Sequence, residues 1–112
     1  MDNFNNPACI VEHILPFEEE MGVSLDGLYA KVLNESADFV SILITGEMRS
    51  LRLNPDGRTI GIIAAGYDAA GRVVAREEYF LGDHVPELVP FSVRLYSAVG
   101  HFSKLLVYPE CS

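Results

Sequence analysis

The residues of this chain that could do chemistry are few, and the most suggestive group lies in one short loop. Asp83 and His84 are adjacent, and Glu87 follows three residues later. Carboxylates and imidazoles are standard metal ligands, so this loop is a candidate metal or small-ligand site, or an enzyme active site. The other histidines, His13 and His101, are distant in sequence. A solvated loop is the simpler interpretation, and we favour it.

Motifs for nucleophilic catalysis and for phosphate binding are also weak. Cys9 and His13 have the spacing of one helix face, but the apolar residues around them favour a strand. The chain has no Gly-x-Ser-x-Gly elbow. Gly57, Gly61 and Gly66 are too far apart for a dinucleotide-binding fingerprint. We therefore expect a protein that is not an enzyme and that uses no metal or cofactor.

The two cysteines, Cys9 and Cys111, lie near opposite ends of the chain. A disulfide between them would close most of the chain into a ring and would strongly restrict the unfolded state. Each lies in a proline-containing terminal segment whose direction the sequence does not fix. The sequence therefore allows either a disulfide or two free thiols, and we favour two free thiols. Their spacing fits no zinc motif.

The length, charge and hydropathy of the chain limit the kinds of partner that it can bind. The chain has 112 residues and a formal net charge of −8, which suits one acidic domain over residues 1–112. Nucleic acid is disfavoured as a partner, because affinity for it comes from Lys and Arg. No leader peptide is visible, and the uncharged stretch at residues 59–67 is far shorter than the ~20 residues that span a bilayer. We expect a soluble domain that does not insert into membranes, or an envelope or secreted module if it comes from a longer precursor.

Alternating apolar residues predict strands over most of the chain. Val40, Ile42 and Ile44 share one face of a strand. Residues 60–67 are apolar on both faces, which predicts a central strand. Residues 72–82 are charged in the middle, which predicts an exposed face or an edge. Further strands are expected at residues 10–15, ended by Pro16, at residues 91–96, and at residues 102–108, ended by Pro109.

The segment Leu25–Leu33 allows two structures. Its apolar residues fit an amphipathic helix with Ser24 as N-cap. They also fit a strand from Leu28 to Leu33, and we favour the strand. The acidic run Glu18–Glu20 is expected in a solvated loop or a short helical turn.

Turn residues separate the predicted strands. Asp68-Ala69-Ala70-Gly71 predicts a hairpin corner, because Asp can bond the backbone two residues on and Gly accepts a positive φ. Similar turns are expected at residues 55–57, which read Pro-Asp-Gly, and at residues 99–101. Together, the strands and turns predict an all-β fold. It is an antiparallel, immunoglobulin-like β-sandwich of about seven strands, with room for one short helix in the N-terminal third.

Residues 40–96 resemble an FxLYD-type domain, a bacterial and archaeal family of immunoglobulin-like or fibronectin-like sandwiches. The resemblance rests on Gly46, on Tyr67-Asp68 with Gly71 after it, and on Pro90-Phe91. Three positions depart from the pattern: Ser50 replaces an Asn, and Ala64 and Gly66 replace the namesake Phe and Leu. The small residues imply a thinner core or a neighbour packed closely against them. The family implies an accessory module and supplies no catalytic residue.

A mixed-charge surface is the remaining functional candidate. Tyr and Arg are enriched in protein interfaces, whereas exposed ion pairs within the sheet would be the simpler role for the charges. We expect a protein partner, or self-association, with a strand added at a sheet edge. The candidate interaction face consists of Arg72, Arg76, Glu78, Tyr79, Arg94 and Tyr96.

Overall fold

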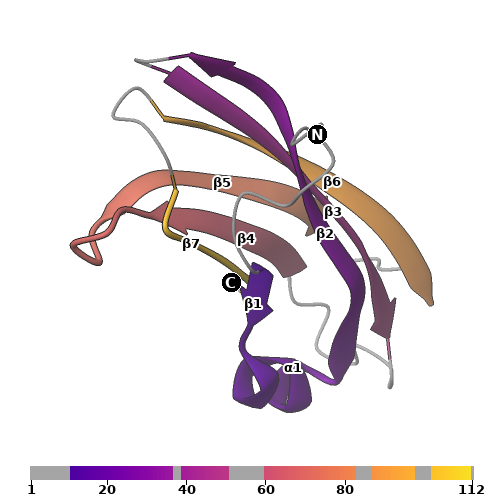
Figure 1. The fold of residues 1–112 in the computed structure, drawn as a ribbon. Coiled ribbons are helices and arrows are strands. Elements are labelled where there is room, and N and C mark those ends of the chain that lie inside the picture. The colour runs from indigo at the N-terminus through magenta and orange to yellow at the C-terminus, as the bar shows by residue number, and fades with distance from the viewer. Residues whose placement is uncertain (1–10, 37–38, 51–59, 83–86, 98–101, 112) are drawn as a thin grey trace.

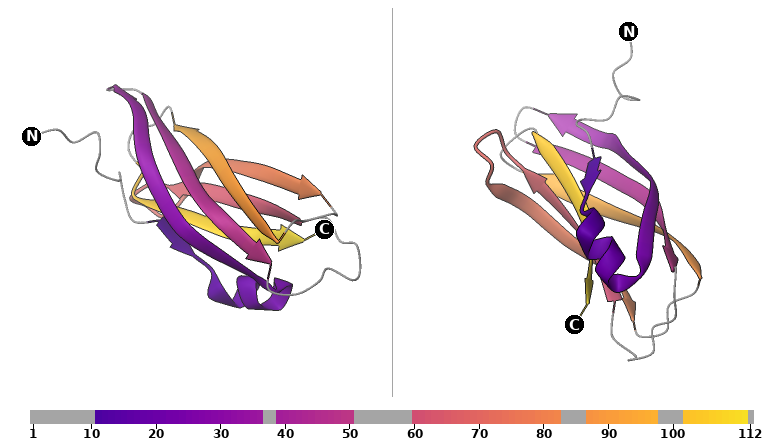
Figure 2. Two further views of the ribbon diagram at one scale, coloured as in Figure 1. Left: turned by 90° about the vertical axis from the view of Figure 1, so that its right-hand side faces the viewer. Right: turned by 90° about the horizontal axis from the view of Figure 1, so that it is seen from below.

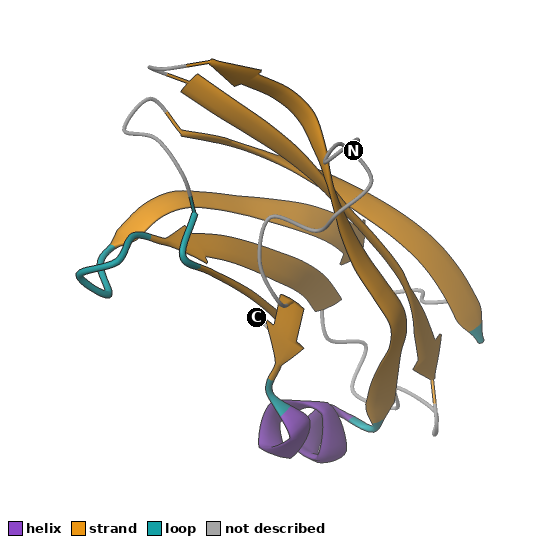
Figure 3. Cartoon of the chain, viewed as in Figure 1, coloured by secondary structure: helices purple, strands orange, loops and turns teal. Residues whose placement is uncertain are grey.

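The computed structural model of the chain describes residues 11–36, 39–50, 60–82, 87–97 and 102–111, which form two packed sheets (Figures 1 and 3). The four-stranded sheet has the order β1-β7-β4-β5, and the three-stranded sheet has the order β2-β3-β6. The predicted all-β sandwich of about seven strands is confirmed. The elements are β1 (Val11–His13), α1 (Leu15–Met21), β2 (Val23–Ser36), β3 (Phe39–Ser50), β4 (Ile60–Tyr67), β5 (Val73–Gly82), β6 (Leu88–Ser97) and β7 (Lys104–Cys111).

The core lies between the sheets and follows the alternation seen in the sequence. Val40, Ile42 and Ile44 of β3 are buried as predicted. All residues of β4 from Ile60 to Gly66 are buried, which confirms that β4 is a central strand. The inward-facing side chains form one apolar cluster, which accounts for the association of the sheets because burial of apolar surface drives folding. Its largest members include Ile42, Ile44, Met48, Ile62, Leu95, Leu105 and Val107.

The described strands pair in antiparallel fashion, with one difference from the prediction. β1 pairs with β7 in parallel, over Leu105 to Val107. A second difference concerns Pro109, which was expected to end the last strand but lies inside β7, opposite Ile62 of β4. Proline is tolerated there because β1 reaches only to Val107, so β7 is an edge strand at Pro109 and needs no donor on that side.

The segment Leu25–Leu33 is strand, as favoured above, and Ser24 is therefore not a helix cap. The short helix is instead α1, which contains the acidic run Glu18–Glu20. Pro16 lies in its first turn, where its missing N–H costs nothing. Gly22 ends the helix in the left-handed conformation. No described helix is long and apolar enough to cross a bilayer.

The buried carboxylate of Glu18 joins three segments of the chain. Its Oε1 accepts a hydrogen bond of 3.0 Å from the backbone N–H of Leu25 in β2. Its Oε2 lies 2.5 Å from Nδ1 of His13 in β1. Phe17, on the same helix, packs edge-on against Tyr108 of β7 at 5.8 Å. Glu18 thus fixes α1 between the two sheets.

Gly66 is small because an aromatic ring occupies the space next to it. The ring of Phe102 lies directly over Gly66, so close that a Cβ at this position would collide with it. The close-neighbour interpretation of the small residues at 64 and 66 is therefore confirmed at Gly66. The expected turns at residues 55–57 and 99–101, and the side chains of Cys9 and Cys111, lie outside what the structure describes.

We expect Gly66→Ala to destabilise the fold by about 1–3 kcal/mol, the usual cost of overpacking a core. Urea unfolding would measure the loss. The double variant Gly66→Ala/Phe102→Leu should lose less than the sum of the two single variants, because the smaller side chain relieves the collision. Strict additivity would show that Phe102 is not the cause.

We expect Glu18→Ala to cost about 1–3 kcal/mol, because it leaves the buried N–H of Leu25 without an acceptor. The exposed neighbour provides a matched control: Glu19→Ala should stay within about 0.5 kcal/mol of the wild type. Glu18→Gln, which can still accept from Leu25, should fall between them. Equal stabilities for the variants at positions 18 and 19 would contradict this role of Glu18.

Candidate interaction groove

The two long sides of the sandwich differ. On one side, β1 and α1 lie between β7 and β2 and cover the space between the sheets (Figure 2). On the other side, β5 is the last strand of its sheet and β6 is the last strand of the other. These two edge strands approach each other without pairing. The open side is therefore formed by β5 and β6.

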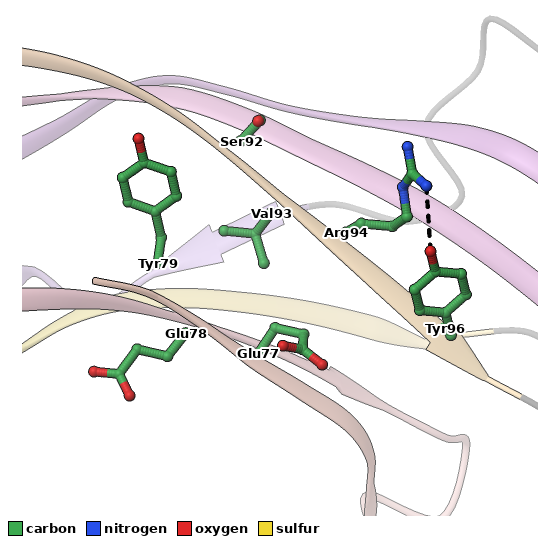
Figure 4. A pocket seen from close by; sticks show the side chains of 7 residues that line it. All are labelled: Glu77, Glu78, Tyr79, Ser92, Val93, Arg94 and Tyr96. Carbon is green, nitrogen blue, oxygen red and sulfur yellow. Dashed lines mark hydrogen bonds between the residues drawn. The ribbon is translucent and has the colours of Figure 1, made fainter. Parts of the chain in front are cut away.

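A groove of about 300 Å³ lies between these two strands. Its floor includes Val93, which is buried at 6% exposure although it belongs to an edge strand. Tyr79 covers that end of the core, with its ring 6.3 Å from the ring of Phe91. Figure 4 shows the lining residues, which are Glu77, Glu78, Tyr79, Ser92, Val93, Arg94 and Tyr96.

The two carboxylates of the groove come from opposite faces of β5. Glu77 pairs in register with buried Ala64, so it begins on the inward face of the sheet and reaches solvent through the open side. Glu78 lies on the outer face, where its carboxylate folds over Gly61 of β4. Among the described residues, neither carboxylate forms a hydrogen bond or an ion pair. The β5 wall of the groove therefore carries two carboxylates without an ion-pair partner among the described residues.

The β6 wall has one cation among the lining residues, Arg94, and it forms no ion pair with the carboxylates of β5. The guanidinium of Arg94 donates a hydrogen bond of 3.2 Å to the hydroxyl of Tyr96 (Figure 4). Both side chains lie on the outer face of the three-stranded sheet, because their neighbours Val93 and Leu95 point into the core. On that face Tyr96 also lies 5.9 Å from the ring of Phe39.

The structure brings together four of the six residues proposed from the sequence. Glu78, Tyr79, Arg94 and Tyr96 line the groove. The other two, Arg72 and Arg76, are not among the lining residues. Arg72 lies at the β4–β5 turn, where its Nε is 3.3 Å from Asp68, and Arg76 reaches Glu110 of β7 at 3.5 Å.

Three lining residues were missed in the sequence: Glu77, Ser92 and Val93. The signal for Glu77 was present, because it shares the alternation of core-facing Ala75 and Tyr79. A charged residue at a core-facing position points to an open edge. No sequence pattern indicates Ser92 and Val93 as groove residues, because their proximity to β5 depends on how the two sheets pack.

The loop candidate for metal binding is described only in part. Asp83 and His84 lie outside the described residues, whereas Glu87 is exposed. The carbonyl of Glu87 accepts a hydrogen bond of 2.8 Å from the N–H of Ser50, which fixes the start of β6 against β3. Over residues 11–36, 39–50, 60–82, 87–97 and 102–111, no three metal-binding side chains gather at one point.

The Asp68 turn closes the β4–β5 hairpin as predicted. Oδ1 of Asp68 accepts from the backbone N–H groups of Ala70 and Arg72, each at 2.9 Å. Gly71 completes the turn at φ 82°, the left-handed conformation that glycine adopts freely. Tyr67 lies beside the turn, with the ammonium of Lys104 4.9 Å from its ring centre. Tyr67-Asp68 is thus a structural corner.

The same turn lowers the pKa of Asp68. The main cause is the hydrogen bond from the N–H of Arg72. The N–H of Ala70 and the Arg72 guanidinium add to it, and partial desolvation opposes it. Because the folded pKa is lower than the unfolded one, the turn is stabilised above the unfolded pKa and loses this stabilisation as the pH falls through the folded pKa.

Comparison with known proteins supports the fold, and it assigns neither a family nor a function. No protein-family model matches the chain, and no curated protein matches it. Two crystal structures of a glycosyl hydrolase family 2 member from Bacteroides cellulosilyticus are similar. One has a TM-score of 0.53 at 15% identity and the other 0.54 at 14%. The matches cover 65% and 67% of this chain, but only 10% and 9% of those chains. They show a β-sandwich of the same kind within a much longer protein.

We expect Asp68→Ala to lower the melting temperature by a few degrees at neutral pH, because the turn loses both backbone acceptor contacts. The difference between variant and wild type should shrink as the pH falls below about 4, the ordinary pKa of Asp in the unfolded chain, and through the lower folded pKa of Asp68. Calorimetry across pH would measure both effects. A constant difference at all pH values would contradict the proposed charge effect.

Proposed function

We propose that this chain is a non-enzymatic protein-interaction or scaffold module that accepts an extended partner strand at the free edge of β6. The observation that carries the proposal is the regularity of this edge. β6 pairs with β3 over ten consecutive residues, from Leu88 to Ser97, without a register shift. In the described part of the fold, its other edge has no strand partner. A regular, unpaired strand edge of this length is a template for an added strand.

The other edge strands are less suited to this role. β2 has register shifts between Asp26 and Tyr29 and between Val32 and Asn34, and such bulges blunt an edge. β1 has three residues and lies beside α1. β5 shows shifts against β4 at both ends of the pairing. β6 is therefore the edge we propose.

Pro90 indicates which main-chain groups of β6 are available. Proline lacks an N–H and is tolerated in a sheet where that position faces away from the ladder. Pro90 lies within β6, opposite Glu47 of β3. Because main-chain direction alternates along a strand, the N–H groups of Ser92, Arg94 and Tyr96 should face outward with it. These donors border the groove, whose Tyr and Arg residues are typical of protein interfaces.

One sequence resemblance and one structural likeness are in keeping with an accessory role. The resemblance to FxLYD-type domains implies such a module, and we retain it as a proposal. The glycosyl hydrolase family 2 chains contain a similar sandwich as a small part of their length, so this chain could serve as an accessory domain of a longer protein. The alternative is a metal- or small-ligand-binding protein or enzyme using Asp83, His84 and Glu87, and no described contact favours it.

The test replaces one outward donor. Peptides selected from a random library on the folded domain should bind the wild type and Ser92→Ala equally. They should bind Ser92→Pro about ten-fold more weakly, since it lacks the N–H that an added strand needs. Urea unfolding would confirm that Ser92→Pro is folded, and hydrogen exchange should slow across residues 88–97 on binding.

Sedimentation over a concentration range would detect self-association by the same edge. A strict monomer that selects no peptide, or peptides insensitive to Ser92→Pro, would refute the proposal.

A further inference from the structure

Resting on the proposed function, we infer that the strand accepted at β6 is basic. It is an extended segment of another protein, with Lys or Arg at alternate positions that face the carboxylate of Glu77 across the groove, beside the second carboxylate of Glu78.

The geometry of strand addition fixes where the partner's side chains go. A strand paired with β6 extends the three-stranded sheet on the open side of the sandwich, beside β5. Its side chains alternate between the two faces of that sheet. One set turns inward, over Val93 and toward the β5 wall with Glu77. The other set turns outward, beside Arg94 and Tyr96.

The charge of the groove favours basic side chains at the positions of the partner that turn inward. The carboxylates of Glu77 and Glu78 have no partner among the described residues, and the whole chain has a formal net charge of −8. Arg94, the cation among the lining residues, forms no ion pair with either carboxylate, and it lies on the outer face of its sheet, where it donates a hydrogen bond to Tyr96. Arg76, the nearest cation on β5, is engaged with Glu110. A cation arriving from the partner would supply an opposite charge to these exposed carboxylates.

The outward set should be uncharged or acidic. These side chains would lie directly beside Arg94, and like charges on neighbouring strands repel each other. The partner segment is therefore expected to alternate a basic residue with a neutral one, rather than to be basic throughout.

Pairing of the β6 strands of two copies of this chain does not meet these requirements. The inward-facing residues of β6 are Val89, Phe91, Val93, Leu95 and Ser97, none of which is basic. Pairing of two β6 strands would therefore leave the Glu77 carboxylates of both copies uncompensated. It would also bring together two chains that each carry a net charge of −8.

The test uses blocked synthetic peptides of about ten residues, long enough to span β6, whose affinities are measured by calorimetry. A peptide of alternating Lys and Thr should bind at least about five-fold more tightly than one of alternating Gln and Thr. A Glu and Thr peptide should not bind. The Lys and Thr peptide should lose affinity at high salt. It should also lose affinity when its alternate amides are N-methylated, because the main-chain bonds to β6 are then blocked.

Two variants of equal charge separate a local effect from a general one. Glu77→Gln/Glu78→Gln should weaken the Lys and Thr peptide about five-fold. Glu12→Gln/Glu19→Gln changes the net charge equally, at exposed positions on β1 and α1, and should leave the affinity unchanged. Loss of affinity in both variants alike would show non-specific attraction and overturn the inference.

The remaining outcomes distinguish the two proposals. Equal binding of the Gln and Lys peptides, with sensitivity to Ser92→Pro, would overturn the basic partner and leave strand addition in place. Binding of the Lys peptide that is insensitive to Ser92→Pro would overturn the inference, because the cation would then be held outside the β6 edge. Failure of every peptide to bind would remove the basic partner. If library selection also yields nothing, strand addition fails with it.

Discussion

The hydrogen bonds of the buried Glu18 carboxylate are the contacts on which the asymmetry of this sandwich depends. A carboxylate out of water is costly unless its oxygens are bonded. Glu18 meets that requirement only with Leu25 of β2 and His13 of β1 in place. Satisfying this one group therefore fixes β1 and α1 across one side of the sandwich. The opposite side of the sandwich, formed by the edges of β5 and β6, is left without such a cover in the described part of the fold.

Each edge of a sandwich carries unpaired main-chain groups. The edge strands of this fold differ in how they are protected against pairing with another strand. The helix side is covered by α1, and β2 is interrupted by register shifts near Gly27. β5 has charged side chains along its middle, which discourage pairing. β6 has none of these protections over its ten residues apart from Pro90 and Arg94. An edge left regular where the others are blunted is the main structural argument for an interaction site.

The sequence predicts the parts of this fold that depend on local chemistry. Alternation identifies β3 and β4, and Asp68 with Gly71 identifies the hairpin. Alternation does not reveal the burial of Glu18, because three successive glutamates in a short helix give no periodic signal of which one turns inward. It also misplaces the end of β7, since Pro109 is acceptable only where β1 has already ended. The groove depends on the packing of β5 against β6, which no local pattern encodes.

The acidic charge and the free edge are best understood together. A regular edge invites identical copies to pair, and mutual repulsion between chains of net charge −8 opposes that pairing. The same charge attracts a basic strand, and Glu77 and Glu78 concentrate it beside the edge that such a strand would use. Repulsion of like chains falls with added salt, as does attraction of the basic strand. Main-chain bonds to β6 would not weaken in this way, so they would provide the salt-independent part of the affinity.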